Sequence, residues 1–221
     1  MENTANVHFM LDLETLDTKP SAHILELALV CFCPFTGRVN EALSRHVRFG
    51  LTPQQGATIS TSTLSWWATE NPTYMLELFT NKNGELYDEL FKLYETLTSA
   101  RELGSVCIWN TGTFDVDIIN NAVKRELSIN KAAINFWEVR DVRSLRQLND
   151  DFGLNNDEWP TSHNAKDDCL RQISYVHSVY GALSERGTTS SGNQGGHTNV
   201  PTSEEQPTDE SARQQTGITG Q

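Results

Sequence analysis

Two acidic residues end an apolar segment close to the start of the chain. Asp12 and Glu14 stand at the end of the sequence VHFMLDLE, which is typical of a β-strand. Because side chains alternate between the two faces of a strand, both carboxylates share one face, while Leu11 and Leu13 point to the other. Neighbouring carboxylates repel each other unless a cation lies between them. Taken alone, the pair fits a metal site and equally a strand that simply reaches solvent through two acids.

A third acid follows a glycine turn in the middle of the chain. The sequence predicts a short apolar strand over residues 105–109, a Thr-Gly-Thr turn, and a helix over residues 114–127 with Asp115 in its first turn. Acidic residues are common at this position because a helix N-terminus attracts negative charge and offers free N–H groups. Taken alone, Asp115 is therefore better explained as a helix-start residue than as a metal ligand.

A histidine and a fourth acid lie five positions apart in the segment SHNAKDD, which begins at Ser162. On one continuous helix, His163 and Asp168 would point about 140° apart and could not share a site. If the helix begins near Asn164, His163 lies on the preceding loop and can reach over Asp168. Histidine suits general-base catalysis near neutral pH, but a single histidine at a helix start is more often a capping or solvated residue.

The elements that must position these residues begin with three strands and a group of helices, followed by strand, helix, strand, helix and helix. The predicted strands span residues 7–14, 24–33, 38–49, 105–109 and 136–139, and the predicted helices span residues 60–70, 72–79, 84–103, 114–127, 142–148 and 164–183. This order indicates an α/β fold: a mixed five-stranded sheet of three antiparallel and two parallel strands, with helices on both faces. It resembles the order of a ribonuclease H-like fold.

Length and composition indicate one folded domain followed by a tail. The chain has 221 residues, of which 37% are hydrophobic and 21% charged, enough to bury a core without disulfides. We expect a domain over residues 1–186 and a disordered, acidic tail over residues 187–221, which is rich in Gly, Ser, Thr and Gln and has no aromatic residue. No apolar run approaches the ~20 residues of a membrane span, and the N-terminus lacks a signal-peptide pattern. We therefore expect a cytoplasmic protein without membrane contacts.

Together, the acidic motifs resemble those of the DEDD exonuclease superfamily, in its histidine-bearing DEDDh branch. The family pattern is D-x-E on the first strand, N-x-x-x-F-D at the start of a middle helix and H-x-x-x-x-D at the start of the last helix. The matching residues run from Asp12 to Glu14, from Asn110 to Asp115 and from His163 to Asp168. Within the superfamily, the chain is similar to small phage and bacterial exonucleases with a Trp-Trp pair, here Trp66-Trp67. The resemblance covers residues 7–183.

The resemblance implies a 3′→5′ exonuclease that hydrolyses phosphodiester bonds and releases nucleoside 5′-monophosphates. It implies two Mg²⁺ or Mn²⁺ ions that act on the attacking and leaving oxygens, and both ions accept hard oxygen ligands. His163 is then the general base. The catalytic carboxylates, which are also the implied metal ligands, are Asp12, Glu14, Asp115 and Asp168.

The resemblance also implies contacts with the 3′-terminal nucleotide, which we expect at Thr15, Leu16, Trp67 and Asn110. Many relatives continue the first motif as Thr-x-Gly, whereas this chain continues as Thr-Leu-Asp, so we expect a different local backbone. Adjacent helical positions diverge by about 100°, so the two tryptophans cannot both be fully buried in one small cluster. We expect Trp67 to face the cleft and to stack on a base. Candidate phosphate partners are Arg140, Arg143 and Lys166.

The net charge of −12 is unusual for a protein that contacts phosphates. Bound cations reverse the local field of clustered carboxylates, but the charge still argues against tight, processive binding to a duplex. The expected partner is therefore a single-stranded or 3′-ended nucleic acid, with DNA favoured over RNA. The alternatives are an exoribonuclease with the same site and a non-catalytic nucleic-acid-binding module with the same fold. The chain could also form a homodimer.

Overall fold

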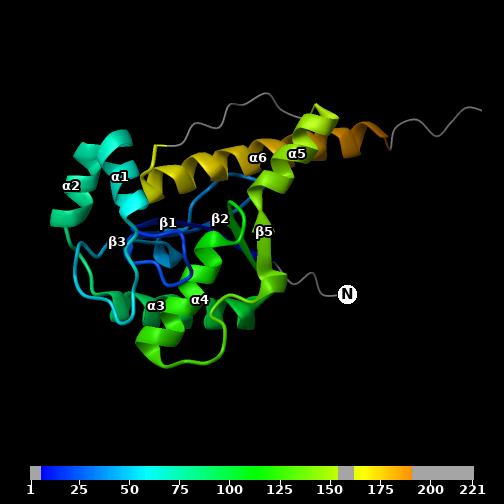
Figure 1. Ribbon diagram of the computed structural model, residues 1–221. Coiled ribbons are helices and arrows are strands. Elements are labelled where there is room, and N and C mark those ends of the chain that lie inside the picture. The colour runs from blue at the N-terminus through cyan, green and yellow to red at the C-terminus, as the bar shows by residue number, and fades with distance from the viewer. Residues whose placement is uncertain (1–5, 154–161, 191–221) are drawn as a thin grey trace, which may run out of the picture.

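The computed structural model describes residues 6–153 and 162–190 (Figure 1). Its elements in chain order are β1 (Val7–Thr15), β2 (Ile24–Phe32), the 3-10 helix η1 (Glu41–Leu43), β3 (Arg45–Arg48), α1 (Thr61–Glu70), α2 (Pro72–Thr80), α3 (Leu86–Leu103), β4 (Val106–Asn110), α4 (Phe114–Leu127), the 3-10 helix η2 (Phe136–Glu138), β5 (Val139–Asp141), α5 (Val142–Phe152) and α6 (Ala165–Ser190).

The five strands form one mixed sheet in the order β3-β2-β1-β4-β5. Strands β1 and β3 each pair antiparallel with β2, whereas β4 is parallel to both β1 and β5. The predicted sheet of three antiparallel and two parallel strands is therefore confirmed. Parallel pairing places the ends of β1 and β4 at the same edge of the sheet, and the acidic motifs follow these two ends.

Helices cover both faces of the sheet (Figure 1). Phe9, Leu11 and Leu13 of β1 face a core that they share with α3 and α4. Met10, between them, faces a second core that residues of α6 complete. Strand alternation places Asp12 and Glu14 on the same face as Met10. The acid pair therefore lies on the side of the sheet that α6 covers.

A smaller core holds helices α1 and α2 beside the end of β1. Trp67 of α1 and Leu78 of α2 pack with Leu16 and Leu25. In addition, the indole N–H of Trp67 donates a hydrogen bond of 3.0 Å to the carbonyl oxygen of Thr15. These contacts fix the helix pair next to the point at which the acid pair leaves the sheet.

The long strand predicted over residues 38–49 is wrong in extent. Only Arg45–Arg48 is strand, and η1 precedes it. The reason is local: the side chain of Asn40 accepts a hydrogen bond of 3.1 Å from the backbone N–H of Ala42 and so caps η1. Helix capping by asparagine competes with strand pairing at this position.

Three boundaries on the C-terminal side also differ from prediction. Residues 136–138 form η2 rather than strand, because Asn135 and Glu138 make a reciprocal capping box that favours a helical turn. Helix α5 continues to Phe152, before Gly153 in a left-handed conformation (φ 55°), and the backbone of α6 is helical to Ser190. Within residues 6–153 and 162–190, none of the helices has the length and hydropathy of a membrane span. Residues 191–221, most of the predicted tail, lie outside the described residues.

Candidate active site

Three of the predicted metal ligands come together under the start of α6. Asp12 and Glu14 project from β1 and Asp168 from the first turn of α6, and one carboxylate oxygen of each lies within 4.8 Å of the others. Glu14 and Asp168 are buried, and Asp12 is partly exposed. A cluster of carboxylate oxygens is the ligand type that Mg²⁺ and Mn²⁺ prefer.

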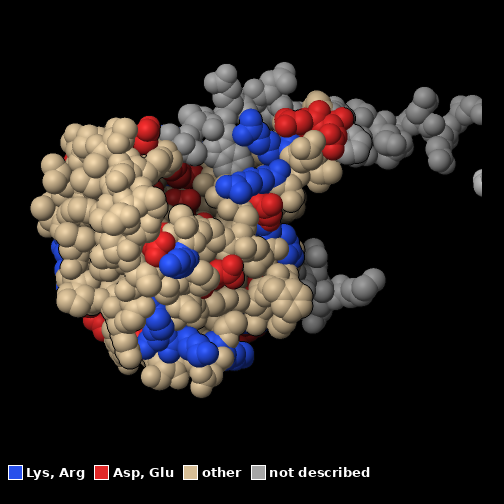
Figure 2. All heavy atoms as spheres, viewed as in Figure 1, with Lys and Arg blue, Asp and Glu red and all other residues tan. Residues whose placement is uncertain are grey.

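Asp115 reaches the same cavity from the first turn of α4. It lies outside the group of three but lines, with Asp12, Glu14, His163 and Asp168, a cavity of about 680 Å³. Figure 2 shows acidic side chains inside a hollow on this face of the molecule, with Lys and Arg side chains beside it. The structure therefore brings all five predicted catalytic residues to one cavity.

Burial raises the pKa of Asp12, Glu14 and Asp115. It raises the pKa of Asp12 well above its ordinary value, and repulsion by Asp115 and Glu14 adds to the effect. Burial and repulsion by Glu26 and Asp168 likewise raise the pKa of Glu14. Burial raises the pKa of Asp115 to about 7, although backbone hydrogen bonds and Arg143 act to lower it. Acids that repel one another in a buried cluster fit a divalent cation, which would offset the repulsion.

Asp168 is held by donors from both sides of the α6 start. Its Oδ1 accepts hydrogen bonds from the backbone N–H of Ser162 at 2.8 Å and from Arg171 at 2.7 Å. Its Oδ2 accepts one from the backbone N–H of His163 at 2.9 Å. Arg171 follows Asp168 by one helical turn, and the two form an ion pair. These contacts fix the orientation of the carboxylate toward β1.

His163 precedes α6, as the spacing predicts. Helix α6 begins at Ala165, and the side chain of Asn164 accepts a hydrogen bond from the N–H of Asp167 at 3.0 Å. His163 has a left-handed backbone (φ 54°), a conformation that histidine adopts more readily than most residues. Its ring packs edge-on against Trp66, with ring centroids 4.7 Å apart. The loop position therefore brings the imidazole and Asp168 to the same cavity.

The prediction for the two tryptophans is wrong in its choice of residue. Trp67 is only 2% exposed and belongs to the small core, whereas Trp66 is 40% exposed. Trp67 borders a smaller cavity of about 420 Å³ that Thr15 and Trp66 also line. Its indole N–H is used by the Thr15 carbonyl. Trp67 is therefore a buried residue in the wall of the smaller cavity. Trp66 is the tryptophan with an exposed ring face.

The other predicted substrate contacts divide in the same way. Thr15 lines the smaller cavity. Leu16 is fully buried, and its N–H and C=O bond to the backbones of His23 and Ser60, so its predicted substrate contact is wrong in this structure. Asn110 is fully buried at the end of β4, and its side-chain amide has no hydrogen-bond partner among the described residues. Its substrate contact stays a prediction.

Of the three predicted phosphate partners, only Arg143 lines the cavity that holds the acids. The guanidinium of Arg140 donates to the carbonyl oxygens of Trp137 and Val139 instead. Lys166 lines a separate, small cavity. Arg146, one turn after Arg143 on α5, also lines the cavity that holds the acids and was not among the predicted residues.

Two further residues at the site were missed. Gln172 lines the cavity one turn after Asp168, and its side-chain N–H donates to Asp12 at 3.5 Å. Its i+4 position from Asp168 was a usable signal, because such residues share a helix face. Glu26 lies opposite Glu14 in the β1–β2 ladder. The signal there was an acid within the otherwise apolar strand ILELALVCF.

The fold is ribonuclease H-like, and four acids and a histidine line one of its cavities. The family model described as the 3′-5′ exoribonuclease Rv2179c-like domain matches residues 7–180, and the chain belongs to this family. None of the curated proteins matches the sequence.

Solved nuclease structures have a similar fold at low sequence identity. Cell-death related nuclease 4 (CRN-4) matches with a TM-score of 0.51 and 13% identity, over 79% of this chain and 64% of that one, so this chain spans about two thirds of that nuclease. A 3′-exonuclease in 3′-end specific recognition of a histone mRNA stem-loop matches with a TM-score of 0.46, 16% identity and 82% of each chain. The nuclease domain of 3′hExo, a DEDDh family member bound to rAMP, matches with a TM-score of 0.45 and 14% identity. The match covers 85% of this chain and 95% of that one.

Removing a charge from the cluster is expected to stabilise the metal-free protein in a pH-dependent way. The pKa of Asp115 is about 7 in the folded chain, against an ordinary value of 3.8. The unfolded chain therefore ionises first as the pH rises, and the folded state loses stability between about pH 4 and pH 7. Asp115→Asn should melt close to the wild type at pH 4 and increasingly above it up to pH 7. Each kcal/mol is worth about 2–4 °C in a chain of this size.

The measurement is a series of melting curves in chelator, repeated with Mg²⁺. Added Mg²⁺ is expected to raise the Tm of the wild type most at high pH, because a cation replaces the missing counter-charge. A Tm difference between the two proteins that does not change with pH would show that folding does not raise the pKa of Asp115.

Proposed function

We propose that this chain is a metal-dependent exonuclease that removes nucleotides from the 3′ end of single-stranded RNA and releases nucleoside 5′-monophosphates. The observation that carries the proposal is the joint placement of Asp12, Glu14, Asp115, Asp168 and His163 around one cavity. A non-catalytic module of this fold has no need to keep four mutually repelling acids and a histidine together.

The choice of RNA differs from the preference for DNA expected from sequence. It is supported by the description of the family as an exoribonuclease domain. The carboxylates and His163 do not themselves discriminate between the sugars, because a single backbone group is enough to contact a 2′-OH. Preference for DNA remains the competing prediction, and matched oligomers distinguish the two.

Asp12, Glu14, Asp168 and Asp115 would hold two Mg²⁺ or Mn²⁺ ions. When bound, such ions act as Lewis acids on the attacking and leaving oxygens of the phosphodiester. Gln172 orients the carboxylate of Asp12 through its side-chain N–H. His163, at the cavity wall, would accept the proton of the attacking water on a ring nitrogen.

The smaller cavity and the arginines of α5 lie at two ends of the site and suggest the path of the bound RNA strand. The smaller cavity, with Thr15 and the exposed face of Trp66, adjoins the catalytic cavity through shared lining residues, Glu14 among them. We assign it to the 3′-terminal nucleoside. Arg143 and Arg146 line the catalytic cavity from α5, and neither forms an ion pair among the described residues. We assign them to phosphates upstream of the scissile bond.

The test uses RNA and DNA oligomers of one sequence, labelled at the 5′ end, with Mg²⁺, with Mn²⁺ and with chelator. A ladder that shortens from the 3′ end, faster for RNA and absent in chelator, is the expected result. Release of the 5′ label as a mononucleotide without labelled oligomers of intermediate length, or cleavage that persists in chelator, would contradict the proposed reaction. Faster degradation of DNA would restore the preference expected from sequence.

Trp66→Ala is expected to raise KM by about 5–150-fold with a smaller effect on kcat. Base stacking on an aromatic ring contributes about 1–3 kcal/mol, and Trp66 is the exposed tryptophan beside His163. The control is Trp137→Ala, since Trp137 is 60% exposed and lines none of the site cavities. Equal effects of the two substitutions on KM would remove Trp66 from the substrate site.

Arg143→Gln and Arg146→Gln are each expected to weaken binding of single strands and to reduce its salt dependence. Loss of one phosphate contact lowers the slope of log K against log salt by about 0.7 for a single strand. Binding is measured by fluorescence anisotropy in chelator, at several salt concentrations. Arg38→Gln serves as the control because Arg38 lines a different cavity. An unchanged slope in both variants would contradict the assigned strand path.

A further inference from the structure

Glu26 is a fully buried carboxylate next to the catalytic acids. It lies opposite Glu14 in the antiparallel ladder of β1 and β2, and opposing residues point to the same face of a sheet. Its side chain has no exposed surface. Like charges at opposing positions are unfavourable, and Glu26 contributes to the raised pKa of Glu14. An acid at this position therefore requires a compensating role.

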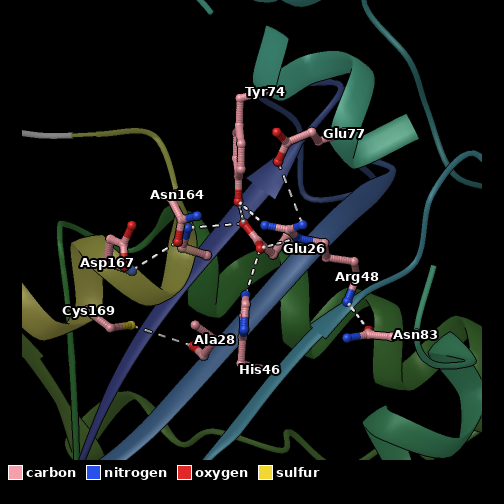
Figure 3. Close-up of polar contacts among 11 residues, drawn as sticks. Glu26, Ala28, His46, Arg48, Tyr74, Glu77, Asn83, Asn164, Asp167 and Cys169 are labelled. Carbon is pink, nitrogen blue, oxygen red and sulfur yellow. Dashed lines mark hydrogen bonds and ion pairs between the residues drawn. The ribbon is translucent and has the colours of Figure 1, made fainter. Parts of the chain in front are cut away.

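Four donors surround this carboxylate (Figure 3). Oε1 accepts hydrogen bonds from Nε2 of His46 at 2.7 Å and from Nε of Arg48 at 3.0 Å. Oε2 accepts one from the hydroxyl of Tyr74 at 2.7 Å and one from the backbone N–H of Ala165 at 3.1 Å. Burial acts to raise the pKa of Glu26, but the hydrogen bonds from His46, Tyr74 and Arg48 lower it below its ordinary value.

The donors belong to the elements that carry the rest of the site. Ala165 is the first residue of α6 and lies between His163 and Asp168 in sequence. Tyr74 belongs to α2, which packs with α1 through the small core that contains Trp67. Arg48 of β3 donates a second hydrogen bond, to the Tyr74 hydroxyl at 3.1 Å. The carboxylate thus joins the sheet, the start of α6 and the α1–α2 pair at one point.

We propose that Glu26 is a positioning residue, which fixes the start of α6 and the α1–α2 pair against the acid pair of β1. This inference rests on the proposed function, because the geometry that it protects is that of the exonuclease site. A glutamine cannot replace the carboxylate, because one of its two terminal atoms is an N–H₂ donor that would face donors. Loss of the contact with Ala165 would free the start of α6, and loss of the contact with Arg48 would break the connection to β3.

The test compares Glu26→Gln with Glu138→Gln. Glu138 is a matched control, since it is 4% exposed, pairs with Arg101 at 2.6 Å and accepts a backbone N–H from Asn135 at 2.8 Å. It does not line the catalytic cavity. Each variant is assayed for kcat and KM on single-stranded RNA well below its Tm, and for the Mg²⁺ concentration that gives half of the Mg²⁺-induced rise in Tm.

Glu26→Gln is expected to lower kcat by about 10–100-fold, to change KM by much less, and to require about tenfold more Mg²⁺, which is the usual range for outer contacts of a metal site. Glu138→Gln is expected to lower Tm without either change. A kcat and Mg²⁺ requirement of Glu26→Gln equal to those of Glu138→Gln would overturn the proposal.

Two outcomes are separated by the design. If the wild type hydrolyses neither RNA nor DNA, the proposed function fails, and the Mg²⁺ dependence of Tm still tests Glu26. If Glu26→Gln does not fold, Tyr74→Phe takes its place, because it removes one donor and leaves the carboxylate. Tyr74→Phe is then expected to lower kcat several-fold, and a kcat equal to that of the wild type would overturn the proposal.

Discussion

Asp12→Asn is expected to reduce the rate of hydrolysis by on the order of 10⁴-fold or more, the scale of losing a central member of a catalytic unit. Asp12 lies in the group of three carboxylates, and the charge of Asp115 helps to raise its pKa. Asparagine keeps the shape of the side chain and removes its charge, so the proposed ions would lose one carboxylate ligand. The rate is measured on a 5′-labelled single strand in Mg²⁺ and in Mn²⁺.

The same variant should be at least as stable as the wild type in chelator. Because the pKa of Asp12 is raised, its ionised carboxylate lowers the free energy of unfolding in the absence of a cation. The substitution removes this charge. Asp167→Asn is the control, because Asp167 is exposed on α6 beside Asp168 and lies outside the acid group. Substantial hydrolysis by Asp12→Asn in Mn²⁺ would remove Asp12 from the metal site.

Replacement of His163 is expected to lower kcat by about 10²–10⁴-fold, the range for loss of a general base. Two substitutions are needed because the backbone of His163 is left-handed (φ 54°). Alanine is strained in this conformation, whereas asparagine tolerates it. Both keep the backbone N–H that donates to Asp168. Equal losses of kcat in His163→Ala and His163→Asn would therefore assign the effect to the imidazole.

Mg²⁺ binding should be retained in both variants, because His163 lies outside the group of three carboxylates. The rise in Tm with Mg²⁺ measures this binding independently of catalysis. His177→Ala is the control, since His177 lies farther along α6 and bonds to the carbonyl oxygen of Pro34. A loss of only a few-fold in kcat, or a lost Mg²⁺ effect on Tm, would show that His163 is not the base.

The sequence by itself determined the elements whose signals are local. Apolar periodicity located β1, β2, β4, α3 and α4 almost to the residue, because side-chain burial follows the period of a strand or helix. The spacing from His163 to Asp168 required a helix start between them, and α6 begins at Ala165. Local capping was also the source of error, since Asn40 and Asn135 each begin a short 3-10 helix where a strand was expected.

The sequence predicted which acidic motifs belong to one site, but it did not predict the distances between their side chains. Alternation along β1 placed Asp12 and Glu14 on one face, and only the packing of α6 on that face decided that Asp168 lies within 4.8 Å of them. Asp115 lines the same cavity but stays outside the group, which spacing along the chain does not encode.

Tertiary structure alone decided which of two adjacent or chemically equivalent residues lies at the site. Trp66 and Trp67 have the same chemistry, and burial of Trp67 against Leu16 left Trp66 exposed. Arg146 reaches the cavity because α5 passes beside it, whereas Arg140 turns to backbone carbonyls. Glu26 becomes part of the site through donors as distant in sequence as Ala165. Each of these outcomes depends on contacts between segments far apart in the chain, and no local pattern of residue types specifies such contacts.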